Sequence, residues 1–206
     1  MKYYLDITLV PDAEINLGFL WQKVYQQLHL ALVDAAVIAS DSNSVVAVSF
    51  PEYGSKVFPL GSKLRLFSLT KEAFSQLDID KWLIRLTDYV HCKKVKSVPD
   101  TVSYVCFTRQ QFTTNVNRLA RRRAKRKGES IAQALKHYTD FENQKSKLPF
   151  VNMVSLSTNS DADCMGNHKF RLFISKNIAD DSKIGGVNTY GLSNREPINQ
   201  TTVPWF

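Results

Sequence analysis

The chain opens with two hydrophobic patterns of different period. Apolar and polar side chains alternate over residues 3–9, which predicts a half-buried strand, because successive side chains of a strand point to opposite faces. From residue 17 onward apolar residues recur every three or four positions, the spacing of one side of an amphipathic helix. The residues of this apolar stripe are Leu17, Leu20, Trp21, Val24, Leu28 and Leu32.

Further strands and a second helical region follow. Strands are predicted over residues 45–50 and 64–69, on either side of a turn region rich in Pro, Gly and Ser. A helical region is predicted over residues 70–86 and a fourth strand over residues 90–98, which ends before a proline. The order β-α-β-β-α-β is that of a ferredoxin-like fold, so we expect a ferredoxin-like N-terminal domain over residues 1–98.

The second half of the chain has a different organisation. A strongly basic segment predicts a helix over about residues 115–127, and the polar residues 159–168 predict a loop. We expect a C-terminal α/β domain over residues 99–206, which makes the whole chain α+β, with its last two aromatic residues docked on the body of the protein. The other elements predicted here are strands over 104–107, 151–158, 170–175 and 187–192 and a helical stretch from 130 to about 143.

The basic segment is the most distinctive part of the sequence. Seven of the ten residues 118–127 are Lys or Arg and none is acidic, so this segment carries most of the formal net charge of +8. A basic block of this density is typical of phosphate binding, and its Ala, Leu, Arg and Lys residues all favour helix. A solvated helix face or a nuclear-type address remains an alternative, although solvated faces usually mix charges of both signs.

Composition narrows the class of protein. With 206 residues, 44% of them hydrophobic, the chain can form one large domain or two small ones. The sequence pI of about 9.4 favours a nucleic acid as partner. Three cysteines without CxxC spacing indicate reduced thiols and a cytoplasmic location. No apolar run approaches the ~20 residues of a membrane span, and the first residues lack the apolar segment of a signal peptide.

The sequence offers little for metal or nucleotide chemistry. The four histidines have no metal-ligand spacing, no phosphate-binding glycine loop is present, and no carboxylate cluster suits a two-metal nuclease. Asp161 and Asp163 can bind a cation but better fit a flexible acidic loop. We therefore expect neither a metal nor a cofactor. The histidines are His29, His91, His137 and His168.

A route to RNA cleavage without a metal remains open. A ribose 2′-OH can attack the neighbouring phosphate if a base removes its proton, and histidine suits this role near neutral pH. His29 lies at the flank of the apolar stripe, and Ser155 and Ser157 share a face of a predicted strand. By itself each of these residues, and Tyr190 as well, fits an ordinary structural role.

Taken together, several short motifs resemble the type I-F CRISPR RNA-processing endoribonuclease family. Each motif is weak alone, but their order and spacing are specific and cover nearly the whole chain. The motifs are Tyr4-Leu5-Asp6-Ile7, Leu28-His29-Leu30-Ala31-Leu32, Val48-Ser49-Phe50-Pro51, Arg109-Gln110-Gln111, Leu148-Pro149-Phe150-Val151, Ser155-Leu156-Ser157-Thr158, Phe170-Arg171-Leu172-Phe173-Ile174, Gly185-Gly186, Tyr190-Gly191-Leu192-Ser193 and Val203-Pro204-Trp205-Phe206.

The resemblance implies a ferredoxin-like domain joined to an RNA-binding domain, with specific roles for individual residues. The catalytic histidine of the family falls on His29, the ribose-holding serine on Ser155, the active-site tyrosine on Tyr190 and a supporting serine on Ser157. The base-reading pair falls on Arg109 and Gln111, and an aromatic residue that packs on the base at the foot of the stem falls on Phe170. Phosphate contacts fall on Arg118, Arg121, Arg122, Lys125 and Arg126.

The chain departs from the family pattern at a few positions. Residues 125 and 127 are Lys where Arg or His would match better, and residues 159–168 look like an insertion. His168, at the end of that insertion, is an alternative to His29 as the catalytic histidine.

The resemblance implies a metal-independent, hairpin-specific endoribonuclease that cleaves CRISPR repeat transcripts 3′ of a hairpin. Its products would carry a 2′,3′-cyclic phosphate and a 5′-OH. The enzyme would keep the hairpin as part of a type I-F crRNA-guided complex, so its partners would be the repeat RNA and other subunits of that complex. The alternative hypothesis is a structured-RNA-binding subunit without catalysis.

Overall fold

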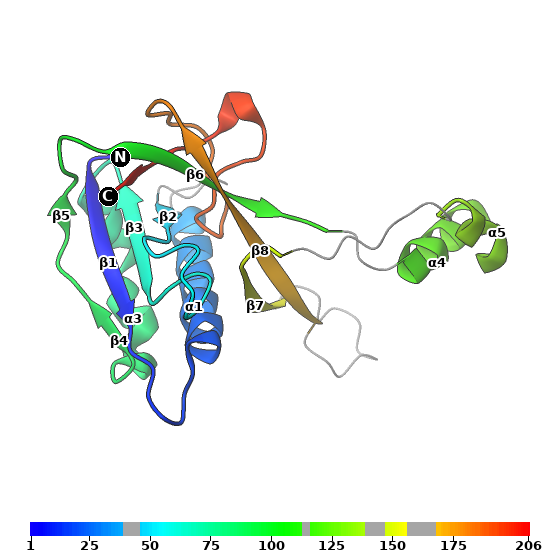
Figure 1. The fold of residues 1–206 in the computed structure, drawn as a ribbon, viewed down its shortest axis with the longest axis horizontal. Helices are drawn as coiled ribbons and strands as arrows, with labels where there is room; N and C mark the ends of the chain where they lie inside the picture. The colour runs from blue at the N-terminus through cyan, green and yellow to red at the C-terminus, as the bar shows by residue number, and fades with distance from the viewer. Residues whose placement is uncertain (39–45, 113–115, 139–146, 156–167) are drawn as a thin grey trace. The chain divides into compact units, whose positions relative to one another are not determined.

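The computed structural model describes residues 1–38, 46–112, 116–138, 147–155 and 168–206, and the chain forms two compact units. The first unit, Met1–Gln110 with Pro149–Phe206, contains both β-sheets, and the second is Gln111–Leu148 (Figure 1). The fold is mixed α+β, as predicted. The division at residue 98 into a ferredoxin-like and an RNA-binding domain stays a prediction.

The first sheet of the larger unit has the strand order β2-β3-β1-β4, with antiparallel pairs throughout. Helix α1 packs against α2 and α3, and the β-α-β-β-α-β order predicted from the hydrophobic pattern is present (Figure 1). The strands are β1 (Tyr3–Leu9), β2 (Ala47–Ser49), β3 (Lys63–Ser68) and β4 (Val90–Cys92), and the helices are α1 (Leu17–Ile38), α2 (Glu72–Leu77) and α3 (Ile79–Leu83), which continues into the short 3-10 helix η1 (Ile84–Leu86).

The predicted fourth strand is divided in two. β4 pairs with one end of β1, and β5 (Lys96–Ser97) pairs with the other end. The three residues 93–95 between them lie opposite only Leu5 and Asp6 of β1, so the edge strand carries one extra residue. This is a β-bulge, which interrupts the ladder and bends an edge strand, and the single strand predicted over residues 90–98 was therefore wrong.

The second sheet has the order β7-β8-β6-β9 and is also antiparallel. Both sheets contribute to one hydrophobic core, in which the ring of Phe50 meets the edge of Phe107 with 5.2 Å between centroids. Trp21 of α1 also packs against Phe50, with 5.6 Å between ring centroids. The strands are β6 (Ser103–Gln110), β7 (Phe150–Ser155), β8 (His168–Ala179) and β9 (Val203–Trp205).

Two predictions for the end of the chain had different outcomes. The terminal aromatic residues are docked as expected: β9 pairs with β6, and Phe206 packs edge-on against Tyr4 at 5.1 Å. The strand predicted over residues 187–192 was wrong, because this segment contributes one isolated bridge, at Val187, and otherwise forms a tight turn. Its Asn and Gly residues are typical turn formers. The apolar pattern of the segment nevertheless led to the prediction of a strand.

A buried ion pair ties the first sheet to the end of the chain. The guanidinium of Arg65 donates to both carboxylate oxygens of Asp6, at 2.6 and 3.1 Å, and to the carbonyl oxygen of Phe206 at 3.0 Å. It also lies 4.7 Å from the ring centroid of Tyr4 and 4.1 Å from that of Phe206. Since the two charges are paired with each other, this contact fixes the register of β1 and β3 without leaving a buried charge unpaired.

The smaller unit is a pair of helices, α4 (Val116–Lys127) and α5 (Ile131–Lys136). Its small core is formed by Ala120 and Ala124 of α4 against Ala134 of α5. Gly128, with a φ of +68°, ends α4, and Ser130 begins α5 with a capping box. The helix predicted in the basic segment is therefore present, whereas the helical stretch predicted from residue 130 to about 143 ends already at Lys136, with residues 137 and 138 in a turn and residues 139–146 outside the described ranges.

Two further predictions concern the whole chain. No helix in the described ranges is long and apolar enough to cross a membrane. Cys92 and Cys106 are free cysteines in the structure, and Cys164 lies outside the described residues.

Candidate active site

Two of the predicted catalytic side chains lie directly against each other. The ring of Tyr190 stacks on the imidazole of His29, with 4.2 Å between ring centroids and 12° between planes. His29 lies at the half-buried flank of α1, directly after Leu28 and three residues before Leu32, both of which are fully buried. The apolar stripe thus fixes the helix, and the flank presents the histidine beside it.

The orientation of His29 follows from one hydrogen bond. Its Nδ1 lies 2.8 Å from the carbonyl oxygen of Thr189. A carbonyl oxygen can only accept, so Nδ1 carries the proton, and in the neutral ring the lone pair is on Nε2. Burial lowers the pKa of His29 from its ordinary value of 6.5, and the positive charge of Arg109 lowers it further, against the opposing effect of the Thr189 bond. The ring is therefore neutral at neutral pH, with Nε2 available as a base.

The turn over residues 188–192 places Tyr190 and Thr189 at α1. The side-chain oxygen of Asn188 accepts from the backbone N–H groups of Tyr190 at 2.9 Å and Leu192 at 3.2 Å. The carbonyl of Gly191 accepts from the backbone N–H of Val48 at 2.8 Å, which ties the turn to β2. These bonds hold the turn at both ends, so Tyr190 has little freedom to leave His29.

Tyr25 and Gly191 also hold this turn against the core. The buried hydroxyl of Tyr25, one helical turn before His29, donates to the carbonyl oxygen of Tyr190 at 2.9 Å. Gly191 has a φ of +72°, and a Cβ there would lie 2.4 Å from Cγ1 of Val48. Only glycine satisfies both the conformation and the space at this position.

Arg109 and Phe170 complete this cluster from the second sheet. The guanidinium of Arg109 in β6 lies 5.2 Å from the ring centroid of Tyr190 and 5.5 Å from that of Phe170. Phe170 in β8 meets Tyr190 edge to face at 6.5 Å. The structure therefore brings together four residues singled out from the sequence, and we call them the His29 cluster: His29, Tyr190, Arg109 and Phe170.

Ser155 lies at the end of β7, the strand that meets α1. The side-chain oxygen of Gln26 in α1 accepts from the backbone N–H of Val154 at 3.0 Å, so the strand end is tied to the helical turn before His29. Ser157 lies outside the described residues. His168, the alternative catalytic residue, pairs with Ser155 through the backbone of the second sheet.

The predicted phosphate-binding residues lie away from the alanine contact of α4. With 3.6 residues per turn, Arg118, Arg122, Lys125 and Arg126 fall opposite Ala120 and Ala124, with Arg121 at the edge, and all five cations are exposed. Arg123 differs from them, because it is half-buried and its Nε donates to Glu129 at 2.5 Å. Gln111, the predicted partner of Arg109 in base reading, is exposed and belongs to the smaller unit.

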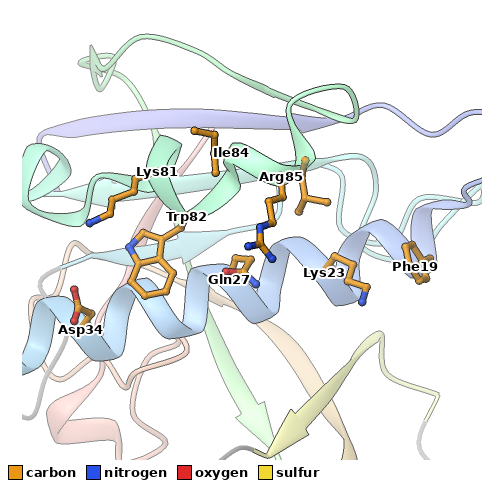
Figure 2. A pocket seen from close by; sticks show the side chains of 9 residues that line it. Phe19, Lys23, Gln27, Asp34, Lys81, Trp82, Ile84 and Arg85 are labelled. Atoms are coloured by element: carbon orange, nitrogen blue, oxygen red, sulfur yellow. The ribbon is translucent and has the colours of Figure 1, made fainter.

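A separate hollow of the larger unit lies away from the His29 cluster. It has a volume of about 690 Å³ and lies between α1 on one side and α3 and η1 on the other. Trp82 and Arg85 point toward α1 (Figure 2). None of the described residues predicted for catalysis or RNA binding lines it. In the part of the chain that the structure describes, no group of three or more His, Cys, Asp or Glu side chains could hold a metal ion.

Sequence reasoning missed the residues that position this site. Tyr25, Gln26 and Asn188 were not singled out, although each contacts a part of the chain that carries a predicted catalytic residue. A signal existed for Asn188, because Asn followed three residues later by Gly is a turn pattern. Nothing in the sequence reveals that Tyr25 and Gln26 contact Tyr190 and Val154, which lie more than a hundred residues away.

Comparison with known proteins identifies the family. A family model described as CRISPR-associated protein (Cas_Csy4) matches residues 4–206. The chain belongs to this family. Two curated relatives are both named CRISPR-associated endonuclease Cas6/Csy4: one from Escherichia coli (strain UTI89 / UPEC) is 31% identical, and one from Pseudomonas aeruginosa (strain UCBPP-PA14) is 32% identical. Each alignment covers the full length of both chains.

The family predicted from the sequence motifs is thus confirmed. Among solved structures, one named CRISPR associated protein Cas6 aligns with all of this chain and 99% of its own, at 13% identity and a TM-score of 0.35.

Proposed function

We propose that this protein is a metal-independent endoribonuclease that cuts CRISPR repeat transcripts on the 3′ side of a hairpin. The attacking group is the ribose 2′-OH just before the cut. Its proton passes to a base, the bond from O2′ to phosphorus forms, and the bond from phosphorus to O5′ breaks as O5′ takes a proton. The products are a 2′,3′-cyclic phosphate and a 5′-OH.

The observation that carries this proposal is the oriented, neutral His29. Its Nδ1 is committed to the Thr189 carbonyl, and burial together with Arg109 lowers its pKa, so Nε2 can accept a proton at neutral pH. Tyr190 holds the ring by stacking on it. A protein that only binds RNA has no need of a base prepared in this way.

The serines complete the proposed chemistry. Ser155 holds the ribose that carries the 2′-OH, and Ser157 supports it. The bond between Gln26 and Val154 favours this role for Ser155, because it ties the end of β7 to the helix that carries His29.

Recognition of the hairpin is assigned to two groups of residues. A-form RNA has a deep, narrow major groove, so side chains reach base edges mainly where a helix ends. Arg109 can pair bidentately with a guanine and Gln111 with an adenine, while Phe170 packs on the base at the foot of the stem. The exposed cations of α4, Arg118, Arg121, Arg122, Lys125 and Arg126, contact backbone phosphates.

After the cut the enzyme keeps the hairpin and acts as one subunit of a type I-F crRNA-guided complex in the cytoplasm. This part of the proposal rests on the family. The two relatives named CRISPR-associated endonuclease Cas6/Csy4 align with the full length of this chain. A cationic helix face suits a retained RNA product, because many phosphate contacts slow dissociation at low salt.

Cleavage of a repeat hairpin in EDTA tests the proposal. Wild-type protein should cut the RNA at one site without added metal and leave a cyclic phosphate, detected by resistance of the new 3′ end to direct ligation. Tight binding without any cutting, with or without Mg²⁺, would favour the non-catalytic subunit. If EDTA abolishes cutting, the reaction depends on a metal ion and the proposed mechanism is wrong.

A further inference from the structure

A second hollow lies between α1 and the strands β7 and β8. Its volume is about 350 Å³. Two of its lining residues are cations and two are amides, and none of the described residues that line it is acidic. We call it the β7–β8 hollow, and its lining residues are Gln22, Asn152, Met153, Lys169, Phe170 and Arg171.

The β7–β8 hollow adjoins the His29 cluster. Phe170 lines the hollow and also meets the ring of Tyr190, so one side chain belongs to both. Along α1, Gln22 precedes His29 by seven residues, which is two helical turns, or about 10 Å, on the same side of the helix. Gln26, between them, bonds to β7. The same helix face therefore leads from the proposed base into the hollow.

The chemistry of the lining residues suits a nucleotide. Lys169 and Arg171 are exposed cations on a strand, and the guanidinium of Arg171 lies 4.7 Å from the ring centroid of Phe150, which limits its freedom. Gln22 and Asn152 each offer an amide donor and acceptor for the edge of a base. Single-stranded RNA is commonly bound in this way, by cations on its phosphates and polar groups on unstacked bases.

We propose that the β7–β8 hollow binds the RNA strand immediately 3′ of the cut. This inference rests on the proposed function, because a substrate cut at the foot of a hairpin must continue past the His29 cluster as a single strand. Lys169 and Arg171 contact its first phosphates, and Gln22 and Asn152 contact a base. Held there, the departing strand keeps its O5′ atom in line for displacement. Once cut, it has only these contacts and dissociates, whereas the hairpin stays.

The larger hollow on the other flank of α1 supplies a matched control. It also carries lysines, Lys23 and Lys81, but it contains the acidic Asp34 and none of the His29 cluster. Replacing these two lysines removes the same formal charge as replacing Lys169 and Arg171. A general loss of positive potential would affect RNA binding equally in both double variants.

The test is a binding measurement with RNA that cannot be cut, because deoxyribose replaces the ribose before the cleavage site. Two hairpins are compared, one ending at the cleavage site and one with four more nucleotides on its 3′ side. Wild-type protein and K23A/K81A should bind the extended hairpin about tenfold more tightly, the effect of one charge-assisted contact. K169A/R171A should lose this gain and bind the shorter hairpin as wild type does.

Two outcomes would overturn the inference. If wild-type protein gains nothing from the extension, the hollow does not hold the departing strand. If K169A/R171A weakens both hairpins by the same factor, these residues contact the stem instead. Neither result depends on cutting, so both are distinguishable from failure of the proposed function, which would show as intact binding without cleavage of all-ribose RNA.

Discussion

The ring of Tyr190 and the imidazole of His29 lie nearly parallel, 4.2 Å apart between centroids. The backbone carbonyl of the preceding residue, Thr189, fixes Nδ1 of the same imidazole. One turn of the chain therefore sets both the plane of the ring and the nitrogen that keeps its proton. Because the two constraints come from neighbouring residues, a change in this turn alters them together.

Replacing the proposed base should stop cleavage and spare binding. H29A is expected to lower the single-turnover rate by ~10² to 10⁴, the usual contribution of a general base, with little change in hairpin affinity. H91A is the control, because His91 is an exposed residue of β4. Retained cleavage in H29A together with its loss in H168A would transfer the role to His168.

The pH dependence of cleavage should report the lowered pKa of His29. The base must be neutral, so the rate should be flat at neutral pH and fall only as pH drops through a pKa below the ordinary 6.5. Removing the positive charge in R109A should raise this pKa and move the fall to higher pH, whereas R109K should not. The readout is the midpoint of the acid limb at saturating RNA; an unmoved midpoint in R109A would show that its charge does not act on His29.

The turn beneath Tyr190 should not tolerate a side chain at residue 191. G191A combines a φ of +72° with a Cβ 2.4 Å from Val48, and we expect it to lower the free energy of unfolding by more than the ~1 to 3 kcal/mol of backbone strain alone. G54A is the control, because Gly54 also has a positive φ, +89°, but no atom lies within 4 Å of its Cβ position. Chemical denaturation compares the two; equal losses would mean that the Val48 contact relaxes without cost.

The attacking group should be the 2′-OH before the cut. Deoxyribose at that one nucleotide is expected to block cleavage and leave binding unchanged, whereas deoxyribose one nucleotide later should have no effect. Gel analysis of both RNAs decides the point. Continued cutting of the first RNA would mean that water attacks the phosphate.

Two adjacent arginines of α4 should behave differently. R122A removes an exposed cation on the side away from α5, and it should weaken binding of all hairpins and reduce the slope of log affinity against log salt by roughly 0.7 to 0.9. R123A removes a residue paired with Glu129, so the slope should not change.

R109A should instead lose ~1 to 3 kcal/mol of discrimination at one base pair. A shallower salt slope in R109A, with equal losses on wild-type and base-pair-swapped hairpins, would make Arg109 a phosphate contact.

The regular strand and helix at the start of the chain could be predicted from the sequence, because the spacing of their apolar residues is a local property of the sequence. The alternation of residues 3–9 and the stripe from Leu17 to Leu32 correspond to β1 and α1. The bulge between β4 and β5 could not be predicted, since it depends on how residues 93–95 register against β1, which no local pattern encodes. The turn at residues 188–192 was mistaken for a strand, because its apolar residues pack in the core while its hydrogen bonds are made by Asn188.

The candidate site was found by resemblance and not by pattern. His29, Ser155 and Tyr190 are ordinary residues in their local contexts, and only the order of several motifs singled them out. The residues that hold Tyr190 in place, Tyr25 and Asn188, contact its backbone groups, and such contacts leave no distinctive mark in a sequence.

The alanine contact between α4 and α5 has a consequence for how the smaller unit exists without RNA. Its fully buried side chains are three alanine methyl groups, and Leu135 and Tyr138 are only partly buried against them, so this core removes little apolar surface from water and contributes little to stability. In addition, the cations on the opposite side of α4 repel one another, which destabilises the helix further. A ligand that binds only the formed helix pair therefore supplies part of its folding free energy. Amide hydrogens of α4 should exchange quickly in the isolated protein and slowly once a hairpin neutralises that charge.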